Sequence, residues 1–382
     1  MNKSIIENMN NHNKNLTSFA CKDDEAIRLS DSKEDYRTPF FKDIDKVLYS
    51  SAYTRYIDKT QVYSNNDNDM ISKRMTHVQM VSKIARTIGR ALGLNEDLIE
   101  AASLAHDLGH VPYGHLGESI LNDISLKNNQ GIFAHNVQSV RVLMNLENNG
   151  LGSNLTIQVL DAVFCHNGEI LEGKYYPMKK TMDQFLNEYN ACYFNEAILK
   201  DCHPMTLEGC VVRISDIISY VGKDIEDAIR LNKIDISLVP SDITNVLGKC
   251  NKEIVDILVN DIITNSIEKN YIALSPEIFS VLQKLIDFNY KNIYNNVMTQ
   301  EAKKIIREKF EYLFEIYLYH LNNKMYDEDI WKLFLNDMCD EYKNSNCNER
   351  MIIDYIAGMT DDFFESQYLK YKKLDNEISS II

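Results

Sequence analysis

The chain has 382 residues, 45% hydrophobic and 25% charged, an ordinary globular composition with enough apolar material for a large core or two domains. Its net charge of −15 argues against a protein whose main task is to coat nucleic acid. Single-stranded nucleic acid stays open as a partner, although the net charge does not indicate it. There is no run of eighteen apolar residues and no apolar block typical of a secretory signal near the start, so we expect a cytoplasmic protein without a membrane partner.

The cysteines follow no metal-binding or disulfide pattern. No two are spaced as CxxC, and the eight stand at positions 21, 165, 192, 202, 210, 250, 339 and 347. We therefore expect reduced thiols that mostly pack in the interior, and no disulfides.

Apolar positions recur at helical spacing along most of the chain, whereas residues 1–35 are rich in Asn, Lys and Ser and predict a flexible or loosely docked leader. A polar loop is expected over 64–69, and helices over about 41–60, 71–92, 96–107, 116–126, 135–148, 154–166, 181–200, 207–232 and most of 241–376. Strand signals are scarce. The expected fold is mainly α, with a helical core over 36–235 and a C-terminal helical region over 236–382.

Helix ends are marked by residues with known capping and breaking behaviour. Gly93 is expected to end the helix of 71–92, and Asn95 to cap the next one. Gly109 and Pro112 are expected to end that next helix.

Six of the nine histidines lie within the ninety residues from His77 to His166. Two of them fall in the run Ala105–His110, which Gly114–Glu118 follows closely. Imidazole and carboxylate together suit a divalent transition metal, and a histidine with a carboxylate three residues further on can carry protons in a hydrolysis. The run therefore predicts a metal site with its catalytic groups beside it.

Two further helices carry polar residues on an otherwise apolar pattern. Arg74 and His77 share a face one turn apart, although a single histidine such as His77 is more often a packed or surface residue. In the helix of 207–232, a polar stripe that would ordinarily face solvent includes Asp216 among apolar neighbours. An unpaired carboxylate there would be costly to bury, and a bound cation would offset that cost.

Taken in order, these motifs resemble the HD phosphohydrolase superfamily and, within it, the dNTP triphosphohydrolases or dGTPase-like proteins. The likeness covers about residues 36–232. His77, the pair at 106–107 and Asp216 resemble its H…HD…D set, and residues 74–77 its RxxH. Residues 106–118 are similar to HDxGHxPFGHxGE, 216–224 to DxxxYxxxD, and 49–62 to the segment before the first histidine.

The resemblance implies one divalent metal held by His77, His106, Asp107 and Asp216. Mn²⁺ or Mg²⁺ is expected, with Fe²⁺, Co²⁺, Ni²⁺ and Zn²⁺ as alternatives. It also implies that a water attacks the α-phosphorus of a dNTP such as dGTP, releasing a deoxynucleoside and inorganic triphosphate.

The resemblance also implies roles for the surrounding side chains. His115 and Glu118 would form a catalytic dyad, and Arg74 and His110 would contact the α-phosphate. Contacts to the sugar would come from Gln61 and Asp224, which would bind the 3′-hydroxyl, and from Tyr220, which would stack on the ring. Each sugar contact has an ordinary alternative, namely a surface amide, a surface charge and an aromatic at the edge of the core.

The chain departs from the family pattern at several positions. Ile217 stands where some relatives have a phosphate-binding lysine, and Lys223 is a candidate replacement. His135 resembles a substrate-side group of some relatives, but together His135 and His166 resemble the two extra imidazoles that hold a second metal in HD phosphodiesterases. The alternative for His166 is a hydrogen bond at a helix end before Gly168.

Two other functions therefore remain open, an HD-type phosphodiesterase or nucleotide phosphatase with a two-metal site, and a catalytically silent nucleotide-sensing HD module. In the C-terminal region, an aromatic and aliphatic stripe over 310–318 is more typical of a core or subunit contact than of a cofactor site. By analogy with relatives we expect a homo-oligomer, a tetramer or a hexamer.

Overall fold

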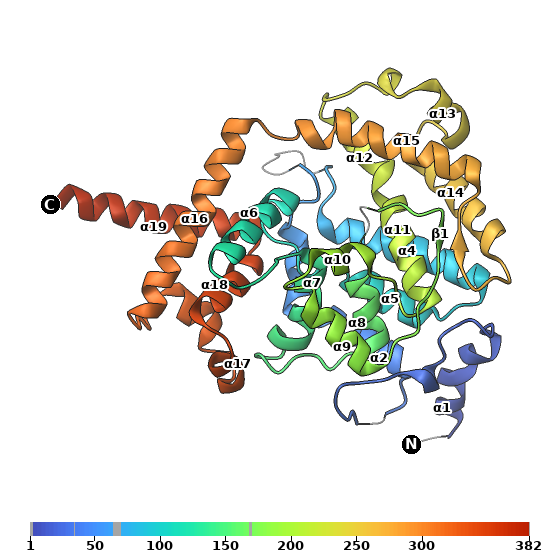
Figure 1. Ribbon diagram of the computed structural model, residues 1–382, viewed down its shortest axis with the longest axis horizontal. Coiled ribbons are helices and arrows are strands. Elements are labelled where there is room, and N and C mark those ends of the chain that lie inside the picture. The colour runs from blue at the N-terminus through green and yellow to red at the C-terminus, as the bar shows by residue number, and fades with distance from the viewer. Residues whose placement is uncertain (1–2, 34, 64–69, 168–169, 382) are drawn as a thin grey trace.

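The computed structural model describes residues 3–33, 35–63, 70–167 and 170–381, and helices dominate it (Figure 1). The strands of this part of the chain are β1 (Lys174–Tyr175) and β2 (Ile272–Ala273), which pair antiparallel. The prediction of a mainly α fold with further C-terminal helices is confirmed. The polar loop predicted at 64–69 lies outside the described residues.

Two groups of helices follow one another along the chain. The first group consists of α1 (Lys3–Asn10), α2 (Pro39–Leu48), α3 (Ser51–Arg55), α4 (Arg74–Leu92), α5 (Glu96–Ala105), α6 (Gly114–Lys127), α7 (His135–Arg141), α8 (Ile157–Phe164), α9 (Met182–Ala191), α10 (Glu196–Asp201), α11 (Leu207–Val221) and α12 (Lys223–Arg230). The second group consists of α13 (Ser241–Leu247), α14 (Asn251–Ser266), α15 (Pro276–Asn292), α16 (Gln300–Asn322), α17 (Asp340–Ser345), α18 (Asn348–Ala357) and α19 (Asp361–Ile381). Short 3-10 turns cover Asn11–Asn15, Asp23–Glu25, Tyr56–Asp58, Ile236–Leu238 and Tyr294–Asn296, and π-helical turns cover Val142–Leu146 and Trp331–Leu335.

Local signals placed several helix ends correctly. Gly93 adopts a left-handed conformation with φ of 64° and ends α4, as predicted. The Asn95 side chain accepts hydrogen bonds from the backbone N–H groups of Asp97 and Leu98 and caps α5, also as predicted. Gly109 and Pro112 do not end α5, because the helix stops earlier, at Ala105.

Three predicted helices are each divided in two. The one over 41–60 is interrupted where Ser50 accepts the N–H of Tyr53 and starts α3. The one over 181–200 is interrupted where Asn195 accepts the N–H of Ala197 and starts α10. The one over 207–232 divides at Gly222. A capping side chain offers the backbone N–H an alternative partner, so a helix can restart within a continuous apolar pattern.

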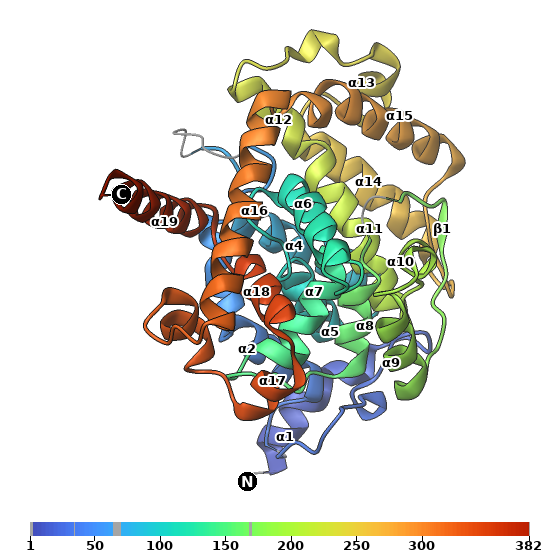
Figure 2. The same ribbon diagram turned by 60° about the vertical axis from the view of Figure 1, so that its left-hand side comes forward.

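The core consists of two hydrophobic clusters. The first cluster runs from Ala20 to Ile293, and at its centre α5 packs against α2, α4, α8 and α11. The second cluster joins α6 to the C-terminal helices, with α16 packed on both α6 and α18 (Figure 2). Residues 236–293 therefore pack with the first cluster, and the predicted domain division at residue 235 stays a prediction.

The segment before α2 makes specific contacts with the core. The backbone N–H of Cys21 donates to Glu208 at 2.9 Å, and Arg28 pairs with Asp43 at 2.6 Å. These contacts anchor part of the predicted leader, whose flexibility stays a prediction.

All eight cysteines are free, and five are buried. None of the described helices combines the length and apolar composition that crossing a membrane requires.

Candidate metal centre and substrate cavity

Three mutually packed helices bring the predicted metal ligands together. His77 lies in the first turn of α4, Asp216 lies in α11, and His106 and Asp107 directly follow α5. The buried face of α5 includes Ala101, Ala102 and Ala105, which have no exposed surface, so neighbouring helices can approach closely there. Residues up to 139 positions apart in sequence thus meet in the first cluster.

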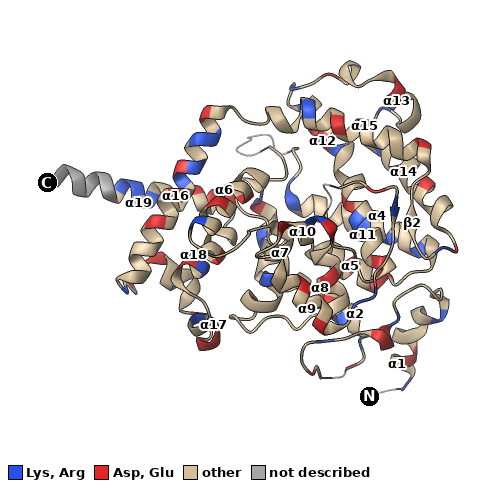
Figure 3. Cartoon of the chain, viewed as in Figure 1, with Lys and Arg blue, Asp and Glu red and all other residues tan. Residues whose placement is uncertain are grey.

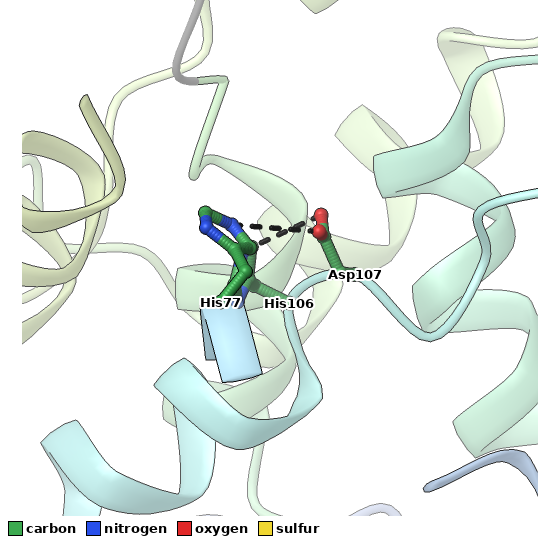
Figure 4. Close-up of side chains that lie close together, drawn as sticks. All are labelled: His77, His106 and Asp107. Atoms are coloured by element: carbon green, nitrogen blue, oxygen red, sulfur yellow. Dashed lines mark ion pairs between the residues drawn. The ribbon is translucent and has the colours of Figure 1, made fainter. Parts of the chain in front are cut away.

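The four side chains face one another over short distances. His77 Nε2 lies 3.1 Å from Asp216 Oδ1 and 3.6 Å from Asp107 Oδ2. His106 Nε2 lies 3.4 Å from Asp107 Oδ1 and 3.7 Å from Asp216 Oδ1. In Figure 4, both imidazoles point toward the Asp107 carboxylate. All four residues are buried.

Hydrogen bonding and ionisation at this cluster fit a bound cation. His106 Nδ1 lies 2.6 Å from the Ser103 carbonyl, which can only accept, so Nδ1 donates and Nε2 is the nitrogen that faces the carboxylates. Burial lowers the pKa of this ring, but Asp107 and Asp216 raise it above its usual value. That buried Nε2 has no hydrogen-bond partner among the described residues. Burial raises the pKa of Asp107 and of Asp216, but the neighbouring imidazoles hold both pKa values well below the usual range. Two imidazoles and two carboxylates form a donor set for a divalent transition metal.

A second group of imidazoles lies on the other side of Asp107. His110 Nε2 is 3.2 Å from Asp107 Oδ1, and the His110 and His135 rings stack with centroids 4.1 Å apart. His135 Nε2 lies 3.1 Å from His166 Nε2. His166 Nδ1 also lies 2.6 Å from the Val163 carbonyl, so the predicted hydrogen bond at a helix end is present together with the contact to His135.

The pair His135 and His166 needs a proton or a cation between its nitrogens. Burial lowers the pKa of His166 to about 3, so its ring is neutral, and since Nδ1 donates to the Val163 carbonyl, Nε2 holds a lone pair. The Glu118 carboxylate lies 2.9 Å from His135 Nδ1, which leaves Nε2 of a neutral His135 as a second lone pair. Two lone pairs at this distance repel unless a positive charge lies between them.

The predicted dyad of His115 and Glu118 is a group of three residues. His115 Nδ1 lies 3.4 Å from Glu118 Oε2, and the carboxylate also accepts the His135 backbone N–H at 2.7 Å. Burial raises the pKa of Glu118, but His135 and His115 together hold it well below its usual range. His115 keeps 64% of its side chain exposed, whereas Glu118 keeps 16%. An ionised, fixed carboxylate therefore orients an accessible imidazole.

Two of the cations near these histidines are held by other groups. Arg74 is buried, pairs with Asp107 and donates to the Thr60 carbonyl at 3.0 Å. Lys59 is also buried and donates to the carbonyls of His110 and, at 3.2 Å, Ala357. Burial lowers the pKa of Lys59 well below its usual value. Lys59 thus ties the loop after Asp107 to the end of α18.

A cavity of about 410 Å³ opens beside the metal cluster. It is lined by ten residues that the sequence predicted, namely Gln61, Arg74, His77, Asp107, His110, His115, His135, Asp216, Tyr220 and Asp224. Val62, Tyr113, Gly114 and Leu116 complete this part of the lining. The cavity is large enough for a small-molecule ligand that reaches the histidine and aspartate groups.

The rest of the wall comes from the C-terminal region, and the sequence reasoning missed it. Its members are Tyr290, Tyr294, Val297, Met298 and Lys303. Tyr294 donates from its hydroxyl to Asp224 Oδ2 at 2.8 Å, and burial raises the pKa of Asp224 to about 7. The only trace of this wall in the sequence was the pair Tyr290 and Tyr294, four residues apart, and that spacing is equally typical of the packed face of a helix.

The family models match both parts of the chain that build this site. Residues 74–221 match the HD domain, and residues 272–370 match the phosphohydrolase-associated domain. The chain is 36% identical to a deoxyguanosinetriphosphate triphosphohydrolase-like protein of Caldanaerobacter subterraneus, with 94% of this chain and 92% of that protein covered. A protein of the same description from Clostridium perfringens strain 13 is also 36% identical, with 96% and 97% covered. The chain belongs to the deoxyguanosinetriphosphate triphosphohydrolase-like family.

The family assignment makes this chain an HD-domain hydrolase whose His/Asp cluster can hold a divalent metal. One residue predicted to contact the substrate does not line the cavity. Lys223 is not among the residues lining the cavity, and its ammonium group pairs with Asp227 at 2.7 Å and with Glu226 at 3.8 Å. The prediction that Lys223 replaces a missing phosphate-binding lysine therefore has no geometric support, because α12 starts anew after Gly222 and carries the side chain to its own acidic residues.

Proposed function

We propose that the protein hydrolyses deoxynucleoside triphosphates, dGTP among them, at the α-phosphorus to a deoxynucleoside and inorganic triphosphate, and that it does so in the cytoplasm. The observation that carries the proposal is one cavity that reaches both the His/Asp cluster and residues suited to a sugar. His77, His106, Asp107 and Asp216 would hold Mn²⁺ or Mg²⁺. The names of the relatives support this substrate class.

When bound, the metal would offset negative charge on the phosphoryl oxygens and lower the pKa of a water. Arg74 and His110 line the same cavity and would bind the α-phosphate oxygens. His115, exposed to the cavity and oriented through Nδ1 by Glu118, would use Nε2 to deliver a proton to the departing 5′-oxygen.

The sugar end would be recognised by polar groups that the fold holds in place. Gln61 Oε1 is buried without a hydrogen-bond partner among the described residues, and Asp224 is fixed by the Tyr294 hydroxyl. Both line the cavity and would bind the 3′-hydroxyl. Tyr220 would lie against the ring where a 2′-hydroxyl would clash, which favours deoxynucleotides.

Product analysis tests the reaction directly. The full-length protein, incubated with Mn²⁺ and a panel of dNTPs including dGTP, should release intact triphosphate and the deoxynucleoside in equal amounts. Orthophosphate or a nucleoside monophosphate as the first product would overturn the proposal. Tight dNTP binding without turnover under Mn²⁺, Mg²⁺ and Co²⁺ would instead support a nucleotide-sensing HD module.

A two-metal phosphodiesterase or nucleotide phosphatase is the second candidate, and the pair His135 and His166 favours it. Their Nε2 atoms lie 3.1 Å apart, and the neighbouring carboxylate Asp107 faces imidazoles on both sides. A second divalent metal among these groups would take the place of the proton that otherwise lies between the two Nε2 atoms. Metal content per subunit distinguishes the two candidate functions. One metal ion per subunit supports the triphosphohydrolase, whereas two metal ions per subunit, together with turnover of a phosphodiester, support the phosphodiesterase or phosphatase.

We also propose that the protein forms a homo-oligomer, a tetramer or a hexamer. α19 projects away from the rest of the molecule in both ribbon views (Figures 1 and 2), and Leu369 and Leu374 on it are exposed. An isolated helix is marginally stable in water, so a second copy of the chain that covers this helix would stabilise it. Light scattering of the purified protein would measure the assembly, and a monomer at micromolar concentration would refute it.

A further inference from the structure

The C-terminal wall of the cavity contributes one lysine. Lys303 lies in the first turn of α16, in a part of the chain that none of the predicted site residues comes from. We infer that Lys303 binds the outer phosphates of the substrate, and thereby lets the cavity favour a triphosphate over a ligand with a single phosphate. This inference rests on the proposed function and names a recognition group for it.

Lys303 is the cation of this cavity that the other described residues leave unpaired. The other lining residue with a permanent positive charge is Arg74, which pairs with Asp107 and the Thr60 carbonyl and is the residue proposed to bind the α-phosphate. Lys303 is half-buried, and its ammonium group makes no ion pair or hydrogen bond within the described part of the chain. The lining carboxylate Asp224 accepts from Tyr294. An ammonium group at a cavity wall that no described residue pairs with is available to a ligand anion.

The electrostatics of a triphosphate require such a group. A triphosphate carries more negative charge than one divalent metal offsets, and the excess lies on the phosphates furthest from the metal. Arg74, the other cation of the lining, lies beside Asp107 at the metal cluster. Lysine is a common point-charge partner for phosphate. The remaining charge therefore needs a cation from outside the histidine group.

The packing of α16 brings this cation to the same cavity as the proposed proton donor. α16 packs against α6, which carries His115, and both residues line the cavity. Lys304 and Arg307 follow on α16, and Figure 3 shows Lys and Arg gathered on the N-terminal half of this helix. Those two residues pair with Glu308 at 3.9 Å and Asp123 at 2.7 Å. Substitutions of these two paired cations on the same helix therefore serve as controls for substitutions of Lys303.

Calorimetric binding of inorganic tripolyphosphate and of orthophosphate to the Mn²⁺-loaded, full-length protein tests the inference without requiring turnover. Lys303→Ala should weaken tripolyphosphate binding by about tenfold, as expected for the loss of one charge-assisted contact, and orthophosphate binding by less than about twofold. Lys303→Arg should restore most of the affinity for tripolyphosphate. Lys304→Ala, the matched control one residue further on, should bind both anions as the wild type does.

The inference is overturned if Lys303→Ala binds tripolyphosphate as tightly as the wild type does, or if it loses both anions equally. Its failure is distinct from failure of the proposed function, which is judged by the products of the wild-type protein. Wild-type release of triphosphate with an unchanged KM for dNTP in Lys303→Ala would refute only the role of Lys303. Selective loss of tripolyphosphate binding in a protein that releases no triphosphate from dNTPs would refute only the reaction.

Discussion

Asp107 is the residue at which the two imidazole groups meet. Its Oδ2 faces His77 at 3.6 Å, while Oδ1 faces His106 at 3.4 Å, His110 at 3.2 Å and His166 at 3.8 Å. A carboxylate with partners on both oxygens has little freedom to rotate. It can therefore position a ligand cation on one side while it fixes substrate-side imidazoles on the other.

Replacement of Asp216 by Asn tests the metal cluster. Asp216→Asn keeps the size of the side chain but removes a charged oxygen that faces both His77 and His106, so metal occupancy should fall by about tenfold or more. Metal analysis after gel filtration measures this. Unchanged occupancy would contradict the assignment of Asp216 as a ligand.

Replacement of His115 separates proton transfer from metal binding. His115→Ala should abolish turnover, because the exposed imidazole paired with Glu118 is lost, while metal content stays near that of the wild type. The ring lies 5.4 Å from that of His110 and is not part of the cluster of His77, His106 and Asp107. Loss of metal together with activity would mean that His115 is a ligand and not a proton donor.

At the scale of elements, the site depends on how closely α7 approaches the loop after α5. A Cβ built at Gly109 would meet the Ser139 backbone nitrogen at 2.2 Å and the His135 carbonyl at 2.3 Å. The Gly109 N–H donates to Ser139 Oγ at 2.8 Å, and the same hydroxyl donates to the His106 carbonyl at 2.6 Å. This contact sets the position of His135 relative to Asp107.

Gly109→Ala should therefore separate α7 from the metal loop. The clash is with backbone and cannot be relieved by a flexible side chain, so we expect a loss of about 3 kcal/mol in the free energy of unfolding and a large loss of activity. Urea denaturation and steady-state kinetics measure both. Gly173→Ala, where the nearest atom is 3.8 Å away, is the matched control and should change stability by less than about 0.5 kcal/mol. Equal behaviour of the two variants would contradict this account.

At the scale of the whole molecule, the cavity depends on both hydrophobic clusters. Tyr294 comes from a turn after α15 and packs with the first cluster, whereas Lys303 comes from α16, which belongs to the second. A change in how the clusters pack would alter both the sugar end and the proposed phosphate end. The phosphohydrolase-associated region is thus a structural part of the site.

The attachment of the N-terminal segment should be sensitive to pH. Glu208 is buried, accepts the N–H groups of Cys21 and Asn95, and has a pKa raised by burial to about 7. Between pH 4.5 and 7 the unfolded chain loses this proton while the folded chain keeps it. The contribution of Glu208 is therefore fully present below pH 4.5 and is lost as pH rises through 7.

Glu208→Gln should remove this dependence while keeping an oxygen that accepts both N–H groups. We expect the wild type to lose roughly 2–3 kcal/mol more stability than the variant between pH 4.5 and 8, since one pKa unit corresponds to about 1.4 kcal/mol. Urea denaturation of both proteins at the two pH values checks this. Parallel losses in wild type and variant would show that Glu208 does not titrate in this range.

Local chemistry in the sequence was enough for the mainly α fold, for the cap at Asn95 and for the end at Gly93, whereas the resemblance to the HD superfamily named the residues that converge, namely His77, His106, Asp107 and Asp216. These features depend on short-range periodicity, on capping geometry and on motifs whose residue types indicate a particular chemistry. Only the tertiary structure decided that Tyr294 fixes Asp224 and that Lys303 lines the same cavity as His115. An apolar stripe shows which face of a helix is buried but not which helix covers it, so contacts between segments seventy or more residues apart require the folded chain.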